Sequence, residues 1–374
     1  MKILVNTTRV IVGILFIFSG LVKAIDPLGL SYKMQEFFEL WQMTQFNEHT
    51  LWLSVVMIAF EIIAGAALLL GWQMKLFSWL LLLLILFFTF LTGYAYLSGK
   101  FRNCGCFGDC IPITPLVSFL KDVVLTVLIL FLFSNRNKIQ PFFSRKVNAV
   151  LISLVTIFSF GLQWYALTYQ PPVDCLPFKR GNNISEKMQI PAGALPDSFA
   201  IRFIYEKGGK QYEFAPAELP ADLNTYNYVS RTDKLIRKGN AEPPIKGFAL
   251  SGITDQDSTS IVLSQPYAVL LFCEDFSTPF TAWKDDFTKL YVAVKAKNIP
   301  VYVITNRADE ARNNFTAAPF ADIQIFKCDY TAIRSAARTN PTFYLLKQGT
   351  VVDKQSHKRM DKILNKVESI TVQN

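Results

Sequence analysis

The sequence predicts a multi-domain membrane protein: an all-α four-helix transmembrane bundle plus a fifth transmembrane helix, followed by an extracytoplasmic α/β domain. Three observations support this prediction. Hydrophobic residues make up 51% of the 374-residue chain, and its mean hydropathy of +0.26 is high for a soluble protein. Long apolar stretches are confined to residues 1–168. From about residue 243, short apolar strands alternate with amphipathic helices, which is typical of an α/β domain.

The apolar stretches are long enough to cross a bilayer. A helix needs about 20 apolar residues to span the hydrocarbon core. Five stretches meet this length, at roughly residues 3–22, 51–71, 76–97, 116–134 and 147–168. The net charge of +9 is not gathered into a basic block with interleaved aromatic residues, so nucleic-acid binding is not expected.

The distribution of lysine and arginine predicts the orientation of these spans. The loop SNRNKIQPFFSRK carries Arg136, Lys138, Arg145 and Lys146 and no acidic residue, so it is expected on the cytoplasmic side. The N-terminus is then cytoplasmic, and everything after Thr168 is extracytoplasmic. Lys100 and Arg102 run against this orientation, because they fall in a loop that it places outside.

Three cysteines occupy the short loop FRNCGCFGDCIP between the third and fourth spans: Cys104, Cys106 and Cys110. With Cys175, just after the fifth span, they form a four-thiol set on the oxidising side, where disulfides persist. In a redox interpretation, Cys104 and Cys106 form a labile disulfide, with Cys110 and Cys175 as resolving thiols. In a structural interpretation, Cys104 or Cys106 pairs permanently with Cys110 or Cys175. Bound metal is the weakest alternative, because the C-x-C-x₃-C spacing differs from that of zinc sites, and we predict no metal.

Ionisable residues inside the apolar stretches are a second feature that calls for explanation. Placing a carboxylate at mid-bilayer costs roughly several kcal/mol of free energy unless the group is paired, protonated or hydrated. Glu61 is open to a functional or a structural interpretation, whereas for Lys121 and Asp122 an interfacial position is favoured. Glycines at 13, 20, 65 and 93 would let helices pack closely. The intramembrane polar residues are Arg9, Lys23, Glu61, Lys121 and Asp122, and Arg9, Lys23, Glu61 and Asp122 are expected to converge in the bundle.

Three motifs in the first 135 residues carry a family resemblance. RVIVGILFIFSGLVKAIDP and FEIIAGAALLLG resemble the opening of the DoxX/MauE superfamily of small membrane proteins, and CGCFG resembles its MauE-like branch. The resemblance implies a four-helix bundle similar in outline to vitamin K epoxide reductase and DsbB-type thiol oxidases. It also implies an association with disulfide or quinone-linked redox chemistry and a bacterial inner-membrane location. A quinone is the one candidate cofactor.

The segment after the fifth span changes character. A linker rich in Pro, Gly and Asn is followed by FAIRFIYEKGGKQYEFAPAEL, which reads as a β-hairpin with a Gly-Gly turn. No fold is assigned to residues 173–242. Beyond them, YAVLLFCEDF, IPVYVITN and DIQIFKCD are expected strands with helices between them. PTFYLLKQGTVVDKQSH is an expected hairpin, and KRMDKILNKVESI an expected closing helix.

The order of these elements resembles the thioredoxin fold in its TlpA-like form. Aligned on PPIKGFALSGITDQDSTSIVLSQPYAVLLFCEDFSTPF, the two cysteine positions of that family's active site fall on Ser277 and Phe280, and its cis-proline falls on Pro341. Thiol exchange requires a thiolate, so this domain is expected to lack dithiol–disulfide activity. Cys273 and Cys328 are interpreted as buried free thiols.

The groove that thioredoxin-like domains use for peptides remains a candidate binding surface, because a cis-proline loop exposes backbone groups that pair with an extended chain. The expected partner-binding residues are Ser277, Thr278, Pro279, Phe280, Asn340 and Pro341.

Two functions remain open from the sequence. In the first, the chain binds or assembles other membrane or periplasmic proteins in thiol–disulfide or quinone-linked redox processes and is not itself an enzyme. In the second, it is a membrane thiol oxidoreductase that uses the four loop cysteines. The expected partners are the lipid bilayer and these proteins. The expected division of the chain is a bundle (1–135), a basic loop with the fifth helix (136–168), a linker with a hairpin (169–242) and a thioredoxin-like domain (243–374).

Overall fold

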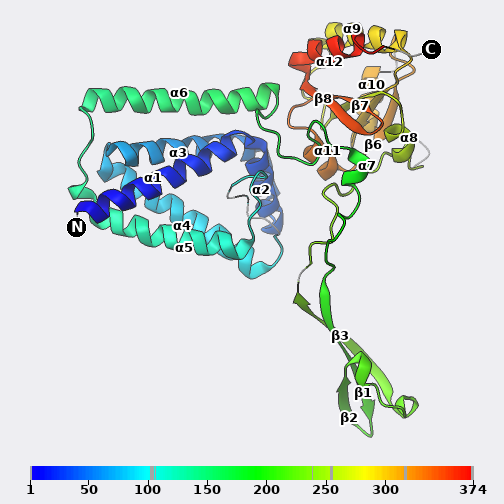
Figure 1. Cartoon of the computed structure of the whole chain (residues 1–374), viewed down its shortest axis with the longest axis horizontal. Coiled ribbons are helices and arrows are strands. Elements are labelled where there is room, and N and C mark those ends of the chain that lie inside the picture. The colour runs from blue at the N-terminus through cyan, green and yellow to red at the C-terminus, as the bar shows by residue number, and fades with distance from the viewer. Residues whose placement is uncertain are drawn as a thin grey trace.

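The computed structural model describes residues 2–101, 105, 107–237, 239–252, 256–315 and 318–371. Three parts follow one another along the chain: a group of long helices, a slender β-sheet arm, and an α/β domain (Figure 1). The α/β domain lies against one end of the helical part, and the arm extends away from both.

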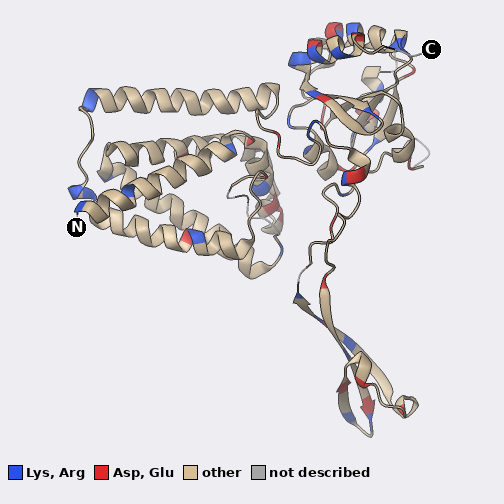
Figure 2. Ribbon diagram, in the orientation of Figure 1, with Lys and Arg blue, Asp and Glu red and all other residues tan. Residues whose placement is uncertain are grey.

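In the described part of the chain, five helices are long and apolar enough to cross a membrane, and they coincide with the five predicted spans. Charged residues are rare along their length and concentrate at helix ends and in the α/β domain (Figure 2). The chain is therefore a multi-pass membrane protein whose outer helix surfaces contact lipid. The five helices are α1 (Lys2–Ala24), α3 (Thr50–Leu70), α4 (Met74–Ser98), α5 (Pro115–Ser134) and α6 (Arg145–Tyr169).

The first four of these helices form a bundle, and α6 runs along its outside next to α3 (Figure 1). Helices α1 and α3 pack closely at Gly13 and Gly65. A Cβ atom on Gly65 would lie 2.8 Å from the carbonyl oxygen of Gly13, so position 65 does not accept a side chain without separating the helices. This is the close packing expected from small residues in a membrane.

The segment between the first two spans contains a helix that was not predicted. Helix α2 (Pro27–Leu40) begins where the Asp26 carboxylate accepts a hydrogen bond from the Gly29 amide, with proline at the first helical position. It lies across the end of the bundle nearest the α/β domain (Figure 1). Its buried residues include Leu30, Met34 and Phe37, a spacing of three to four residues that marks one helix face.

The arm is a three-stranded antiparallel sheet in the order β2–β1–β3. Strands β1 (Ser198–Lys207) and β2 (Lys210–Phe214) are the predicted hairpin, joined at Gly208 and Gly209, both with positive φ. The third strand, β3 (Asn227–Arg237), was not predicted. A short helix, α7 (Ile184–Lys187), precedes the arm.

The α/β domain is built on a five-stranded mixed sheet in the order β6–β5–β4–β7–β8. Strands β4, β5 and β6 are parallel, whereas β7 and β8 form an antiparallel hairpin. All five strands fall within the segments predicted from the sequence. Their bounds are β4 (Ala268–Cys273), β5 (Val301–Thr305), β6 (Gln324–Lys327), β7 (Thr342–Lys347) and β8 (Thr350–Ser356).

Helices cover both faces of this sheet, so the domain has three layers. Alternate residues of β4 point to opposite faces: Leu270 packs with α8 (Thr259–Leu263) and α11 (Tyr330–Ala336). Leu271 packs on the other side with α9 (Lys284–Ala296), α10 (Ala308–Phe315) and α12 (Met360–Glu368). Strands buried on both faces are expected to be continuously apolar, as AVLLFC is. Helices α8 and α10 were not predicted.

Candidate functional site: a cavity and a docked domain at one end of the bundle

A cavity lies within the bundle near the α/β domain. Its walls come from α1, α3, α4 and α5, helix α2 borders it, and Gly105 and Phe107 of the cysteine loop contribute to it. Most of the wall is apolar, with a few polar side chains, which is the usual composition of a small-molecule site. Residues lining it include Phe16, Ser19, Lys23, Met34, Met57, Glu61, Phe88, Thr92, Lys121 and Asp122.

One buried ion pair belongs to this cavity. Lys23 Nζ lies 2.5 Å from Glu61 Oε1, and the two side chains are 3% and 1% exposed. The Ser19 hydroxyl donates to the other Glu61 oxygen at 3.0 Å. Both carboxylate oxygens of Glu61 therefore have a donor, which reduces the cost of a charge in the membrane interior.

A second carboxylate lines the same cavity from α5. Asp122 Oδ1 lies 2.5 Å from Lys121 Nζ, and the hydroxyl of Thr92 donates to Asp122 Oδ2 at 3.0 Å. The Asp122 side chain is 1% exposed, so the bundle encloses it. Lys121 is partly exposed, as a snorkelling lysine would be.

Arg9 does not join this group, so the expected convergence is wrong for this one residue. Its guanidinium donates to the carbonyl oxygens of Leu69 at 3.1 Å and Gln140 at 3.2 Å, and lies over the ring of Phe142. These acceptors lie at the end of the bundle opposite the cavity. Arg9 thus ties α1 to the end of α3 and to the α5–α6 connection, and the other four predicted residues line the cavity.

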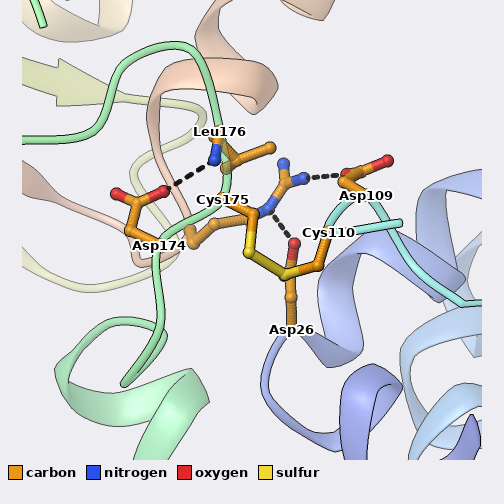
Figure 3. Close-up of a disulfide and its surroundings, with 7 residues drawn as sticks. Asp26, Asp109, Cys110, Asp174, Cys175 and Leu176 are labelled. Carbon is orange, nitrogen blue, oxygen red and sulfur yellow. Dashed lines mark hydrogen bonds and ion pairs between the residues drawn. A yellow bond between two sulfur atoms is a disulfide. The ribbon is translucent and has the colours of Figure 1, made fainter. Parts of the chain in front are cut away.

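Among the described cysteines, Cys110 and Cys175 form a disulfide with 5.0 Å between their Cα atoms (Figure 3). The two interpretations of the sequence grouped these residues, but neither named this pair. The bond joins the cysteine loop to the linker after α6, so both lie at the same end of the bundle. Cys104 and Cys106 lie outside the described residues.

Each half-cystine follows an aspartate that pairs with the α/β domain. Asp109 lies 2.8 Å from Arg338 Nη2 (Figure 3). Asp174 lies 2.9 Å from Lys354 Nζ. Asp26 contacts the same arginine at Nε, also at 2.8 Å. Burial alone would lower the pKa of Arg338, but the two carboxylates outweigh it and raise the pKa. The guanidinium is therefore a permanent cation enclosed between the bundle and the domain.

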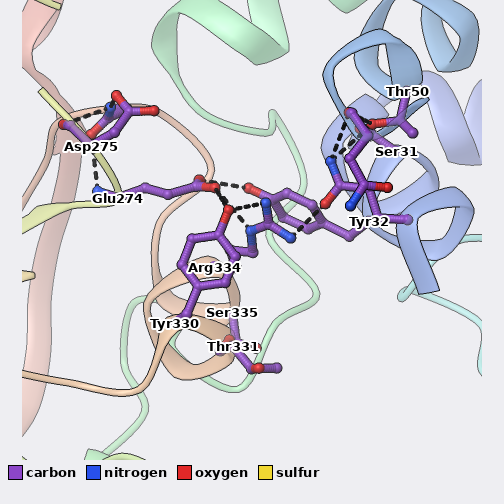
Figure 4. A network of polar contacts seen from close by, with 12 residues as sticks. Ser31, Tyr32, Thr50, Glu274, Asp275, Tyr330, Thr331, Arg334 and Ser335 are labelled. Carbon is purple, nitrogen blue, oxygen red and sulfur yellow. Dashed lines mark hydrogen bonds and ion pairs between the residues drawn. The ribbon is translucent and has the colours of Figure 1, made fainter. Parts of the chain in front are cut away.

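A second network joins α2 to the same domain (Figure 4). Glu274, directly after β4, accepts hydrogen bonds from the hydroxyls of Tyr32 at 3.1 Å and Tyr330 at 2.8 Å. Arg334 pairs with Glu274 at 2.8 Å and donates to the side chain of Gln35 at 2.6 Å. Burial, followed by the charge of Glu274, raises the pKa of Tyr32, so this hydroxyl remains a donor.

The loop before β7 is held from both sides. The peptide bond before Pro341 is cis, as the thioredoxin-like resemblance implies. Gln170, at the end of α6, donates to the hydroxyls of Thr339 at 2.6 Å and Thr342 at 2.9 Å. On the other side, the Asn340 side-chain amide donates to the backbone oxygen of Asp275 at 3.0 Å.

The expected partner-binding residues do lie together at this loop. The hydroxyl of Thr278 donates to the backbone oxygen of Asn340 at 3.1 Å. Phe280 packs into the domain against Trp283. Ser277 and Pro279 remain exposed. The surface facing outward is therefore narrower than the sequence suggested.

The two cysteines of the α/β domain are unpaired and buried, as expected from the sequence. They end β4 and follow β6, with β5 between those strands, so the sheet itself keeps them apart. Burial raises the pKa of the Cys273 thiol, and it raises that of Cys328 to about 12. Neither thiol supplies a thiolate near neutral pH. In the described part of the chain, no group of three or more His, Cys, Asp or Glu side chains is placed to hold a metal ion.

Sequence reasoning missed the residues that dock the domain: Asp26, Asp109, Glu274, Arg334 and Arg338. No signal in the sequence marks them, because isolated charges in polar segments are ordinary. The unusual property is their burial, which depends on two distant segments meeting.

Comparisons with known proteins agree with part of this description. Residues 199–238, which cover most of the arm, match a domain of unknown function (DUF8463). Protein TlpB of Flavobacterium psychrophilum is 29% identical over 162 residues, which are 42% of this chain and 43% of that protein. The match thus spans less than half the length of this relative. No solved structure matches the chain. Residues 1–135, which contain the bundle and the cavity, match the family described as methylamine utilisation protein MauE.

Proposed function

We propose that the chain is a bacterial inner-membrane protein that works as an assembly or partner-binding component of periplasmic thiol–disulfide or quinone-linked redox processes. The observation that carries the proposal is a docked α/β domain without a reactive thiol in its described part. Ser277 and Phe280 occupy the positions where active relatives of the suggested fold have cysteines, and Cys273 and Cys328 are buried. We infer that such a domain binds or positions a partner protein and does not exchange disulfides.

The assignment of a thioredoxin-like fold is part of this proposal. It is supported by the order β5–β4–β7–β8, in which two parallel strands are followed by an antiparallel hairpin. The cis bond before Pro341, at the start of β7, agrees with it. With the periplasmic orientation, the domain, the disulfide and the cavity all belong to the outer side of the membrane.

The proposed partner surface is the exposed rim at Ser277 and Pro279. Two backbone carbonyl oxygens of the loop already accept hydrogen bonds. The Asn340 oxygen accepts one from the Thr278 hydroxyl, and the Pro341 oxygen accepts one from the His357 amide at 3.3 Å. The partner is therefore expected to contact side chains at this rim rather than to add a strand to the loop.

A photo-crosslinking residue at position 277 tests this surface in cells. The matched control is the same residue at Val292, which is exposed on the outer face of α9. The proposal expects one partner, identified by mass spectrometry, from position 277 and not from position 292. Equal capture at both positions, or none at 277, would refute this binding surface.

A membrane thiol oxidoreductase remains the second candidate function, favoured by the cavity. Gly105, which lies between Cys104 and Cys106 in the sequence, lines the cavity, and so do Lys23 and Lys121. In this candidate two cysteine thiols join as a disulfide and release two electrons and two protons, which reduce a bound quinone to its quinol. In this candidate the apolar walls would hold the quinone ring, and Lys23 and Lys121 would lie near its carbonyl oxygens.

Graded reduction separates the two functions. The thiol state of Cys104 and Cys106 is followed by differential alkylation and mass spectrometry in membranes poised at a series of potentials. A disulfide between them that resists mild reductants excludes the oxidoreductase. Cycling of the pair, together with a mixed disulfide trapped by Cys106→Ser, excludes a purely assembling role.

A further inference from the structure

The arm presents an unprotected sheet edge. Strand β1 is paired on both sides, with β2 and with β3. Strand β3 is paired on one side, and within the described ranges no strand pairs with its other side. An 11-residue edge strand leaves a row of unpaired amide and carbonyl groups, which is a template for another strand.

The side chains of β3 are unusual for such an edge. Four large apolar residues are exposed: Tyr228 (58%), Val229 (43%), Leu235 (45%) and Ile236 (68%). Free edge strands are commonly protected by charges, proline or short length. The apolar residues instead occupy both ends of β3, two at each end, and a short polar stretch lies between them.

We propose that β3 pairs with β3 of a second copy of this chain, antiparallel and centred on Thr232. The two arms would then form one continuous six-stranded sheet. A two-fold axis perpendicular to the sheet keeps the same face of both arms on the same side, and it makes every contact occur twice. The axis then lies midway between two copies of the same residue of β3, because side chains alternate between faces with a period of two and opposite residues must share a face.

The charged side chains of β3 indicate which residue lies at the axis. With the axis at Thr232, Arg231 of each copy lies opposite Asp233 of the other. Moving the axis by one residue places two copies of Arg231, or two copies of Asp233, directly opposite each other, and like charges so placed are destabilising. An axis at Lys234 places two lysines opposite each other. In one copy alone, Arg231 and Asp233 already pair at 2.6 Å, so the dimer would bring four alternating charges together.

The apolar ends agree with the same centre. The regular part of the β1–β3 ladder covers residues 230–235, and irregularities lie at each end. When this part pairs with its copy, the end containing Tyr228 and Val229 meets the end containing Leu235 and Ile236. All four exposed apolar side chains therefore find apolar neighbours at once.

The position of the arm suits a neighbour in the same membrane. The arm leaves the α/β domain across the direction of the long helices (Figure 1). Since those helices cross the bilayer, the arm extends sideways over the membrane surface, toward a second copy beside it.

Cysteine crosslinking of the full-length chain in membranes tests the pairing. Thr232→Cys places two cysteines directly opposite, with Cα atoms about 4.5–5.5 Å apart. Ser230→Cys and Lys234→Cys each place identical residues four positions apart, about 13 Å, beyond the roughly 7 Å that a disulfide spans. All three variants contain the same native cysteines, so these cancel in the comparison.

We expect Thr232→Cys to give at least about fivefold more reducible dimer than either control, since only this position meets the disulfide distance. Differently tagged Ser230→Cys and Lys234→Cys chains, when coexpressed, are expected to crosslink with each other. Equal crosslinking at all positions, or none, would overturn the proposal. A crosslink only to a protein of different mass would assign the edge to another partner and also overturn it.

A charge exchange provides an independent check. Arg231→Asp or Asp233→Arg alone places like charges opposite each other and should reduce the Thr232→Cys dimer to the control level. The double exchange restores opposite charges and should restore the dimer. If the double variant crosslinks no better than the single ones, the register is wrong.

Discussion

The carboxylate of Asp109 lies 2.8 Å from the guanidinium of Arg338, although 229 residues separate them in the chain. Asp109 directly precedes the half-cystine Cys110, and Arg338 lies three residues before the cis-proline Pro341. The contact joins the membrane part to the loop before β7. Because Asp26 completes the cluster and the Arg338 side chain is only 4% exposed, the α/β domain is held on the bundle by an enclosed cation.

Removing this cation should loosen the domain. Arg338→Gln leaves Asp26 and Asp109 close together without a counter-charge, and breaking a buried pair in this way costs about 3–5 kcal/mol. Hydrogen exchange should become faster in α2 and α11 and remain unchanged in the centres of the spans. The control is Lys289→Gln, which removes an exposed pair with Asp286 and should cost less than about 1 kcal/mol. Equal hydrogen exchange in the two variants would show that the Arg338 cluster does not hold the domain on the bundle.

The disulfide should be exclusive to its two cysteines. Cys110→Ser is expected to leave Cys175 as a free thiol that an alkylating reagent modifies in the folded protein. It should also lower the free energy of unfolding by about 2–4 kcal/mol, the usual contribution of such a bond. Cys328→Ser, which alters a cysteine outside the bond, should leave Cys175 protected. If Cys175 stays protected in Cys110→Ser, it pairs with another cysteine.

The ion pair in the cavity should show strong coupling. Lys23→Met leaves Glu61 charged and unpaired in the bundle, apart from the Ser19 hydroxyl, and should destabilise the protein by several kcal/mol, about as much as other broken buried pairs. Lys23→Met combined with Glu61→Leu removes both charges and should recover most of this loss. Thermal unfolding in detergent measures the cycle. Additive single effects would mean that the two residues act independently.

Alkaline pH should destabilise the α/β domain partly through Cys328. The ordinary pKa of this thiol is 9.0, and burial raises it to about 12 in the folded chain. Between these values the unfolded chain loses the proton and the folded chain keeps it, so the free energy of unfolding falls as pH rises from about 9 to 12. Below pH 9 the thiol has no effect on the pH dependence. Cys328→Ala should make the profile less steep in that window alone, as measured by proteolysis of the full-length chain.

The sequence predicted those parts of the fold that depend on local pattern. Five apolar stretches of sufficient length became five helices, because no other backbone structure of one segment satisfies its hydrogen bonds in lipid. The five strands and the closing helix of the α/β domain followed from continuous or periodic apolar residues. The hairpin followed from Gly208 and Gly209, which accept the positive φ of the turn.

Other elements carried too weak a local signal. In helix α2 only Leu30, Met34 and Phe37 mark the apolar face, among many polar residues, and β3 is exposed almost throughout, so both patterns were weak. Within the site, the sequence marked Lys23, Glu61 and Asp122 as unusual because charges are rare in apolar helices. It could not show that these residues share one cavity, nor that Arg9 lies apart from them.

By itself, the sequence determined that this protein crosses a membrane, that an α/β domain follows, and that this domain lacks a cysteine pair at Ser277 and Phe280. These properties depend on composition and on residues near one another in the chain. Only the tertiary structure decided that Cys110 bonds Cys175 and that Arg338 lies between Asp26 and Asp109. The reason is physical: pairing and burial depend on which distant segments meet, and this is set by the packing of the whole chain.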